Sequence, residues 1–419
     1  MRRPLAVLAA AVVLGAAACT RSSEQGPVGV FRGTGDITFA CGKDVSQGAQ
    51  LRRLVARWNH DHPDQRVDFQ ELPNSVDQQR AQLVAVAQDH RDPSYDVVCL
   101  DVIWTAEFAH GGYIVPLDPA EFPLDRFVRL PLDSARYDGK LWALPLNTNA
   151  GLLYYRKDLL AAAALQPPTT WAELARDARL LSRHDHIGGY AGQFLEYEGL
   201  TVNVMEAIWA HGGEALADDG TRVVIDSPAS EQALGALAAG FRDGWVPGEA
   251  ITYTEEQGRM AFQAGRLAFL RNWPYAYNLL QDEGSPVRDR FGLAPLPGPS
   301  ALGGQNLAVT ATARNRRTAL ELMKFLTSEE SQRVLFVQGG FPSVLTSVYS
   351  DPSIVTRYPY AAKLLYAIEH ARTRPVSPYY DQVSKDIAHE AELVLQVRKG
   401  PGQAVTDLAA ELEDAVTGR

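Results

Sequence analysis

The feature that most constrains the fold of this chain is an alternation of strand-like and helix-like segments near its beginning. Three short apolar runs have the length of β-strands, at residues 37–41, 67–72 and 95–100. After the first run, apolar residues recur at the spacing of an amphipathic helix, namely Leu51, Leu54, Val55 and Trp58. A second helical stripe lies at 78–88. This β-α-β-α-β order predicts an α/β fold with a parallel sheet and right-handed crossovers.

Strand and helix signals continue beyond this unit. Residues 152–155 are predicted to form a strand, and Thr170 with Glu173 has the spacing of a capping box that begins a helix. Thr327 and Glu330 have the same spacing and predict another helix start. Further helical stripes lie at residues 199–212, 229–243, 318–326 and 403–416.

The beginning of the chain is typical of an export signal. Arg2 and Arg3 precede an uncharged, largely apolar stretch that ends in small residues before Cys19, so residues 1–18 are predicted to be a signal peptide. The stretch is shorter than the roughly 20 apolar residues needed to span a bilayer. Cys19 resembles the lipidated cysteine of a bacterial lipobox, although Ala16 stands where leucine is usual. The alternative is an ordinary signal peptide with an incidental cysteine.

The composition limits which partners the protein is expected to bind. The sequence is 46% hydrophobic and 21% charged, as in soluble globular proteins. Its formal net charge is −10, and loss of the two arginines of the signal peptide makes it more negative. Nucleic acid and anionic lipid are not expected as partners, because both favour clustered Lys and Arg. The Ser-, Gly- and Gln-rich segment 19–35 is predicted to be a flexible tether, and the lipid anchor the only membrane contact.

Two cysteines remain after Cys19, and both lie near the ends of predicted strands. In an exported protein Cys41 and Cys99 are candidates for a disulfide. The alternative is two buried free thiols. Neither cysteine has a Cys or His neighbour at zinc spacing, so no metal site is predicted there.

No standard catalytic motif occurs in the sequence. It has no G-x-x-x-x-G-K-[ST] loop, no G-x-S-x-G elbow and no H-E-x-x-H pair. The close histidine pairs at 60–62 and 184–186 lie in polar segments and are interpreted as solvated loops. We therefore predict no catalytic residue, no cofactor and no metal.

Polar residues that follow predicted strands indicate a ligand site instead. Asp101 comes directly after the third apolar run, and open parallel sheets bind ligands beyond the carboxyl ends of their strands. A carboxylate there can accept hydrogen bonds from two neighbouring hydroxyls. Trp104 is interpreted either as a stacking platform or as core packing, and Glu107 as a brace for the local turn.

Three further segments supply groups that complement such a site. They are Asn147-Thr-Asn149, Arg271-Asn-Trp-Pro274 and Gly303-Gly-Gln-Asn306. A tryptophan suits a wet cleft because one end of the ring is polar, and glycine allows the backbone to approach a ligand closely. Each segment also has a plainer interpretation, as a turn, a core tryptophan and a strand-entry loop respectively.

Eight short segments follow one another in a distinctive order. They are the strand at 36–40, Asp101-Val-Ile-Trp104, Gly139-Lys-Leu-Trp-Ala-Leu-Pro145, Tyr154-Tyr-Arg-Lys-Asp-Leu159, Pro168-Thr-Thr-Trp171, Phe262-Gln-Ala-Gly265, Trp273-Pro274 and 320–326. In this order they resemble the carbohydrate-binding extracellular solute-binding proteins of ABC importers. Within that family, three segments resemble the actinobacterial trehalose-binding lipoproteins, namely Leu100–Phe108, Thr252-Tyr-Thr-Glu-Glu256 and Arg374-Pro-Val-Ser-Pro378.

The resemblance implies a periplasmic-binding-protein-like α/β fold of two lobes, each a mostly parallel sheet flanked by helices, with the sugar between them. It implies an N-terminal lobe of 36–146 and 304–345 and a C-terminal lobe of 147–303 and 346–419. The implied sugar contacts are Asp101, Asn149, Glu256, Trp273, Gly304 and Arg374, with Glu255 as the alternative to Glu256. Further candidates are Lys43, Asp44 and Arg80.

The expected function is that of a monomeric, lipid-anchored receptor that closes around an α-linked disaccharide. Trehalose is favoured, maltose or maltodextrin is the alternative, and the captured sugar is passed to ABC permease subunits. A secreted glycosidase is a rival hypothesis, because Asp101 and Glu256 are two carboxylates of the kind that such enzymes use. A cell-wall interaction protein without a small ligand is another.

Overall fold

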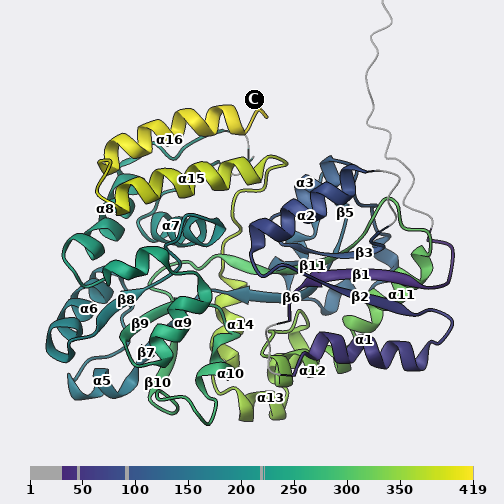
Figure 1. Cartoon of the computed structure of the whole chain (residues 1–419), viewed down its shortest axis with the longest axis horizontal. Helices are drawn as coiled ribbons and strands as arrows, with labels where there is room; N and C mark the ends of the chain where they lie inside the picture. Colours follow the sequence, from purple (N-terminus) through teal and green to yellow (C-terminus); the bar gives the residue numbers. More distant parts are fainter. Residues whose placement is uncertain (1–30, 45–47, 90–93, 218–219, 221, 419) are drawn as a thin grey trace, which may run out of the picture.

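The computed structural model describes residues 31–44, 48–89, 94–217, 220 and 222–418. The predicted signal peptide, Cys19 and most of the predicted tether lie outside these residues. Within them the chain forms two larger β-sheets, each surrounded by helices (Figure 1). Among the helices in this part of the chain, none is both long and apolar enough to cross a bilayer.

The first sheet has five strands in the order β2-β1-β3-β11-β6. Its first three strands match the apolar runs of the sequence, with bounds β1 Ile37–Gly42, β2 Val67–Leu72 and β3 Val97–Asp101. β1 pairs in parallel with both β2 and β3, as the alternating order predicts. The sheet is completed by β11, which is antiparallel to β3 and β6; these two added strands are Leu302–Val309 (β11) and Leu144–Ala150 (β6).

Helices and a covalent link fix this sheet. The apolar stripe predicted after the first strand is the buried side of α1 (Gln50–Asp61), and the second stripe lies on α2 (Val76–Gln88). Because Ala40 is opposite Val98, the next residues of β1 and β3 come side by side, and a disulfide joins Cys41 to Cys99. The link holds the ends of two strands from which the chain enters the candidate site.

The second sheet has four strands in the order β10-β7-β9-β8. Their bounds are β7 Leu152–Arg156, β8 Gly188–Ala191, β9 Leu267–Asn272 and β10 Phe291–Pro295. The predicted capping box is present at the start of α6 (Trp171–Asp185), where the Thr170 side chain accepts from the Glu173 backbone N–H and the Glu173 carboxylate accepts in return. This helix packs on β8 and β9.

The α/β architecture with two sheets is confirmed, but the prediction that each sheet is mostly parallel is wrong. Only β1 with β2 and β3, and β8 with β9, are parallel pairs among the named strands. β7 is antiparallel to both β9 and β10, and β11 is antiparallel to both of its neighbours. The physical reason is that β11 returns from the second sheet and so enters the first sheet from the opposite end.

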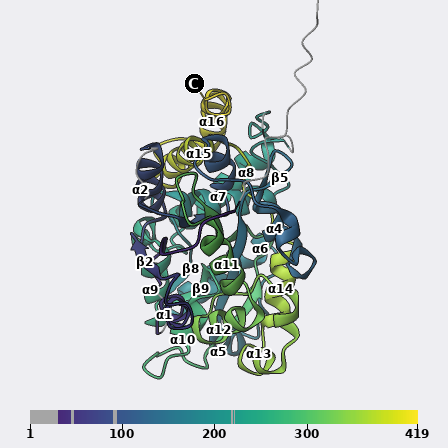
Figure 2. The ribbon, with the colours of Figure 1, turned by 90° about the vertical axis from the view of Figure 1, so that its right-hand side faces the viewer.

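Four helices form a layer beside the second sheet, at the upper left of Figure 1. They are α7 (Glu198–Ala210), α8 (Pro228–Arg242), α15 (Tyr380–Leu395) and α16 (Pro401–Ala415). α15 packs against the other three, and Figure 2 shows α16 as the outermost element at that end. The predicted terminal helix is therefore present as α16, and α7 is buried along almost its whole length.

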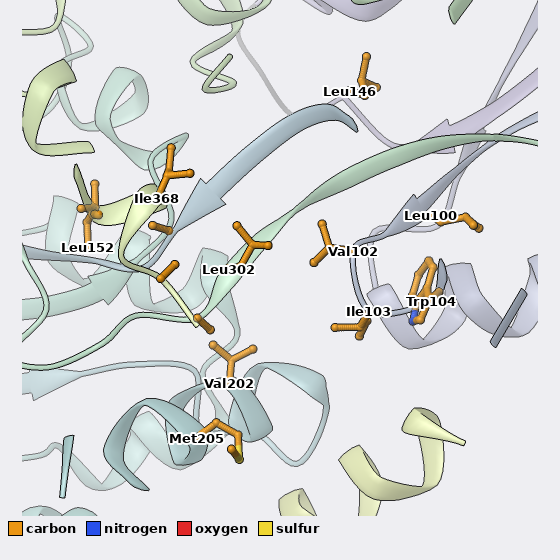
Figure 3. Packing of buried hydrophobic residues seen from close by; sticks show 14 of the residues in the cluster. Leu100, Val102, Ile103, Trp104, Leu146, Leu152, Val202, Met205, Leu302 and Ile368 are labelled. Carbon is orange, nitrogen blue, oxygen red and sulfur yellow. The ribbon is translucent and has the colours of Figure 1, made fainter. Parts of the chain in front are cut away.

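The chain passes between the two sheets in segments that lie close together. β6 leads into β7 through Gly151 alone, and β10 is followed by β11 after a short loop. A bridge between Ala301 and Arg372 adds a third segment to this crossing. Figure 3 shows Leu302 among buried side chains from both sides, including Val102 and Val202. We propose the two lobes named above as the units joined here; their boundaries 146/147 and 303/304 fall inside β6 and β11.

One predicted helix start is wrong. Thr327 does not begin a helix with Glu330, because its hydroxyl donates back to the Met323 carbonyl at the end of α11 (Arg316–Leu326). The next helix, α12 (Glu329–Gly339), is capped by Ser328, whose side chain accepts from the backbone of Ser331.

The other helices are α3 Thr105–His110, α4 Arg129–Ser134, α5 Lys157–Ala162, α9 Glu255–Gln263, α10 Ala276–Leu280, α13 Pro352–Arg357 and α14 Ala361–Glu369.

Candidate ligand-binding site

A cavity of about 230 Å³ lies where the strand ends of the first sheet face residues of the second half of the chain. The first sheet and its loops contribute residues after β1 and β3 and along β6 and β11. The opposite wall comes from the first turns of α7 and α9, from the end of β9, and from the segment before α15. Its polar and aromatic lining comprises Lys43, Asp44, Gln79, Asp101, Asn147, Asn149, Glu198, Glu255, Trp273, Gln305, Phe341 and Arg374.

An ion triad crosses this cavity. Arg374 is almost fully buried, and its Nη2 donates to Asp101 Oδ1 at 3.2 Å and to the Leu302 carbonyl at 3.1 Å. Its Nη1 donates to Glu198, which also accepts from the hydroxyls of Tyr380 and Ser384. Arg374 therefore joins the end of β3 to the start of α7 across the cavity.

Burial and pairing shift the pKa values of this triad in ways that oppose each other. Burial raises the pKa of the Asp101 carboxyl, and the charge of Arg374 offsets this in part. Burial likewise raises the pKa of Glu198, with Arg374 acting in the opposite direction. For Arg374 burial acts to lower the pKa, but the two carboxylates outweigh it and the net pKa is raised. The two carboxylates thus keep the Arg374 guanidinium charged. Burial makes the same two carboxylates easier to protonate than exposed ones.

Several polar groups at the cavity have atoms left for a ligand. Asp101 Oδ2 accepts no hydrogen bond from any described residue, while Oδ1 accepts from Arg374 and the Ile103 backbone. In the described part of the chain, the amide of Asn149 and the indole N–H of Trp273 likewise show no hydrogen-bond partner. These groups include acceptors and donors, as a ligand with several hydroxyls requires.

Backbone geometry brings β11 and β6 close enough to place these groups. Gly304 has a φ of 125°, and an added Cβ would lie 2.4 Å from the Asn147 carbonyl oxygen. Only glycine fits that approach, because other residues rarely adopt this φ and their Cβ would clash. Gly303 is similar: its Cβ would lie 3.0 Å from the Trp273 ring and 3.3 Å from Asn149.

Glu256 does not line the cavity; the alternative, Glu255, does. α9 begins at Glu255, so the two side chains point about 100° apart around the helix axis. Glu255 accepts from Tyr197 Oη at 2.7 Å beside the cavity. Glu256 is turned to Arg259 Nη2 at 2.9 Å and to Tyr275 Oη at 2.6 Å.

Arg80 and Trp104 also lie apart from this cavity. Both line a second hollow of about 200 Å³ between α2 and α15, next to the first. Arg80 makes a bidentate pair with Glu107 and contacts Asp381 Oδ1 at 3.0 Å, so its donors are occupied. Glu107 was expected to brace its local turn, but its carboxylate pairs with Arg80 on α2 instead. Trp104 is 3% exposed, which fits core packing rather than a stacking platform.

The other residues that were predicted to contact the sugar line this cavity. Asp101, Asn149, Trp273, Gly304 and Arg374 come together at the cavity, joined by Lys43 and Asp44 after β1. Four polar lining residues were not predicted, namely Gln79, Asn147, Glu198 and Gln305. Asn147 and Gln305 stand beside predicted residues in the segments already singled out. Glu198 and Gln79 lie on helices whose orientation only the packing reveals.

Comparisons with known proteins identify the kind of protein that carries such a cavity. The family model described as "Bacterial extracellular solute-binding protein" matches residues 42–333. A probable ABC transporter-binding protein of Deinococcus radiodurans is 32% identical over 398 residues, covering 90% of this chain and 92% of that protein.

Solved structures agree with this assignment. The maltose-bound MalE3 of T. maritima is 33% identical with a TM-score of 0.85, and the match covers 90% of this chain and 99% of that one. The GacH receptor of Streptomyces glaucescens shares the fold at 22% identity, with a TM-score of 0.83 over 92% of this chain and 99% of that one. The chain therefore belongs to the bacterial extracellular solute-binding proteins of ABC transporters, and it is a binding protein rather than an enzyme.

Proposed function

We propose that the protein is the sugar receptor of an ABC importer and that it binds an α-linked disaccharide, with trehalose favoured. The observation that carries the proposal is a set of polar atoms around an aromatic ring for which the described residues provide no hydrogen-bond partner. Asp101 Oδ2 and the Asn149 amide face the same cavity as Trp273. Sugar hydroxyls donate and accept, and the C–H face of a pyranose packs on an indole.

The arrangement also favours sugars over apolar solutes. A polar atom left without a hydrogen-bond partner in a closed site costs roughly 1–3 kcal/mol, so a ligand that brings no hydroxyl to Asp101 Oδ2 is disfavoured. Sites built on hydrogen bonds discriminate more strongly than apolar pockets do. Movement of the two proposed lobes about the crossing segments is the expected way in which the sugar is enclosed.

Trehalose is favoured by the segments that resemble trehalose-binding lipoproteins, namely 100–108, 252–256 and 374–378. Two residues at these segments, Asp101 and Arg374, are paired across the cavity at 3.2 Å. Maltose is the second candidate, because the solved relative at 33% identity has maltose bound.

The lipid anchor is part of the same proposal. A receptor that passes a sugar to a permease benefits from being tethered to the same membrane, and Cys19 has the position of a lipidated cysteine. The expected outcome of Cys19→Ser is release of the protein from the membrane fraction of the producing cell. Retention in that fraction would argue against lipidation.

Calorimetric titration with trehalose, maltose, sucrose and maltotriose tests the proposed function. We expect trehalose to bind with the highest affinity, and Trp273→Ala to weaken that binding at least about tenfold while thermal unfolding remains cooperative. If maltose bound most tightly, maltose would become the proposed ligand in place of trehalose. Failure of all four sugars would overturn it.

A further inference from the structure

The back of the Trp273 indole is covered by a buried guanidinium. The Arg271 Cζ lies over the Trp273 ring at 3.9 Å from its centroid. Arg271 is 1% exposed, so this contact is not made at the protein surface. One face of the ring is therefore occupied by the protein and is not available to a sugar.

A fixed frame holds the guanidinium in that place. Arg271 Nε and Nη2 donate to the two oxygens of Glu206 at 2.8 Å and 2.6 Å, and Nη1 donates to Gln193 Oε1 at 3.0 Å. Gln193 in turn donates to the Arg271 carbonyl at 3.2 Å. A bidentate pair fixes the plane of the guanidinium as well as its position.

The same frame is bonded to the crossing segments and to the cavity wall. Glu206 Oε1 also accepts from the backbone N–H of Ala301 at 2.9 Å, directly before β11. Gly151, the residue between β6 and β7, packs on the pair so closely that a Cβ would lie 2.6 Å from Glu206 Oε1. Asn203 links Gln193 to the carbonyl of Gly199, which lines the cavity.

We propose that Arg271 is a positioning residue for ligand binding, whose guanidinium, fixed by Glu206, sets the plane in which Trp273 meets a sugar ring. This inference rests on the proposed function. Arg271 has no described contact with the cavity and acts only through the indole. A lysine cannot replace it, because an ammonium has neither the planar face nor the two-pronged geometry.

The test separates positioning from general stability by a double-mutant cycle. The variant Arg271→Ala/Glu206→Gln removes the guanidinium without leaving a buried charge unpaired, and the amide oxygen that replaces the carboxylate still accepts from Ala301. Trehalose binding is measured by calorimetry, with maltose as the probe if trehalose gives no signal. We expect Arg271→Ala/Glu206→Gln to lower the affinity about tenfold when Trp273 is intact. The same change should lower the affinity less than about twofold when Trp273→Ala is already present.

A matched control is available elsewhere in the chain. Arg179 also lies over a tryptophan, Trp245, at 5.7 Å, and it is ion-paired with Asp243 at 2.6 Å. Neither Arg179 nor Trp245 lines the cavity. Arg179→Ala should leave the affinity unchanged.

The inference would be overturned if removal of the Arg271–Glu206 pair lowered the affinity equally with and without Trp273, because the role would then be merely structural. An unchanged affinity would overturn it as well. Should the double variant not fold, Arg271→Lys retains the buried charge and is measured in the same cycle. Absence of sugar binding by the unmodified protein would overturn the proposed function instead. In that event the near-ultraviolet dichroism of Trp273, isolated by subtraction of Trp273→Phe, still tests whether Arg271→Lys alters the setting of the ring.

Discussion

At the scale of the residue, we propose that Asp101 combines a structural and a binding role. Oδ1 is engaged by Arg374 and the Ile103 backbone, while Oδ2 shows no partner among the described residues and Asp101 lines the cavity. One oxygen thus fixes the carboxylate, and the other is left for a ligand hydroxyl. This division explains how a half-buried charged group can be held in place and still recognise a neutral solute.

Asp101→Asn is expected to weaken disaccharide binding roughly 10- to 100-fold at neutral pH. The reason is that an amide oxygen is a weaker hydrogen-bond acceptor than a carboxylate oxygen, and the neutral amide cannot form an ion pair with Arg374. Calorimetry measures the affinity, and thermal unfolding shows whether the variant is folded. An affinity within about twofold of the parent would contradict the assigned contact.

The raised pKa of Asp101 adds a dependence on pH. Protonation converts the carboxylate from an acceptor into a donor, so sugar affinity should fall as the pH is lowered. Because the pKa of Asp101 is raised, this fall should begin at a higher pH than for an ordinary aspartate. The sign for folding is opposite: a pKa raised by folding favours the folded state at low pH, and this contribution is lost as pH rises. Asp101→Asn should flatten the affinity profile, with Glu198 and Arg374 as the charged groups remaining beside it. An unchanged profile would assign the titration to another group.

At the scale of the element, the ends of β1 and β3 determine where the first wall of the cavity stands. β1 ends at Gly42 and leads into Lys43 and Asp44, and β3 ends at Asp101, so the ends of the two strands place four residues in the cavity lining. The Cys41–Cys99 disulfide joins these strands immediately before those residues. It constrains both the unfolded chain and the edge of the site.

Replacement of both cysteines by serine tests the contribution of this link. The disulfide closes a loop with a sequence separation of 58, and removal is expected to lower the free energy of unfolding by about 2–4 kcal/mol. Chemical denaturation of the double variant gives this value. The parent protein with and without reductant serves as the control, because reductant should lower only the stability of the parent. Equal stability of parent and double variant would contradict the expected role.

At the scale of the whole molecule, charged pairs connect elements that belong to the two proposed lobes. Arg80 of α2 contacts Asp381 of α15 at 3.0 Å, and both side chains are about one fifth exposed. Arg374 links Asp101 to Glu198 in the neighbouring cavity. The two sides of the molecule therefore meet through ions beside the candidate site rather than through apolar packing alone.

Asp381→Asn should weaken sugar binding two- to fivefold, because a partly exposed ion pair contributes about 0.5–1 kcal/mol to the arrangement that brings the two sides together. The loss should shrink at high salt, which screens such pairs. Asp243→Asn is the matched control: Asp243 pairs with Arg179 at 2.6 Å inside one proposed lobe, so its replacement should leave the affinity nearly unchanged. Equal effects of the two variants would argue against a role of the α2–α15 contact in binding.

Local patterns were sufficient for much of the fold and part of the site. Short apolar runs located β1, β2 and β3, and the 3.6-residue period of apolar residues located α1 and α16, because both signals depend on neighbours in sequence. The capping box at Thr170 was predicted for the same reason. Thr327 was misassigned because a hydroxyl that caps the next helix and one that bonds back to the preceding turn have the same local sequence.

The sequence by itself determined the class of fold, the family resemblance and the strand ends at which Asp101, Asn149 and Gly304 stand. Only the tertiary structure decided which of two neighbouring residues on a helix lines the cavity, as with Glu255 and Glu256. It also decided that Arg80 lies in the second hollow and not in the cavity. It also brought Asp101 and Glu198 to opposite sides of the Arg374 guanidinium. These outcomes depend on the rotation and packing of whole elements, and that information arises from contacts between residues far apart in the chain.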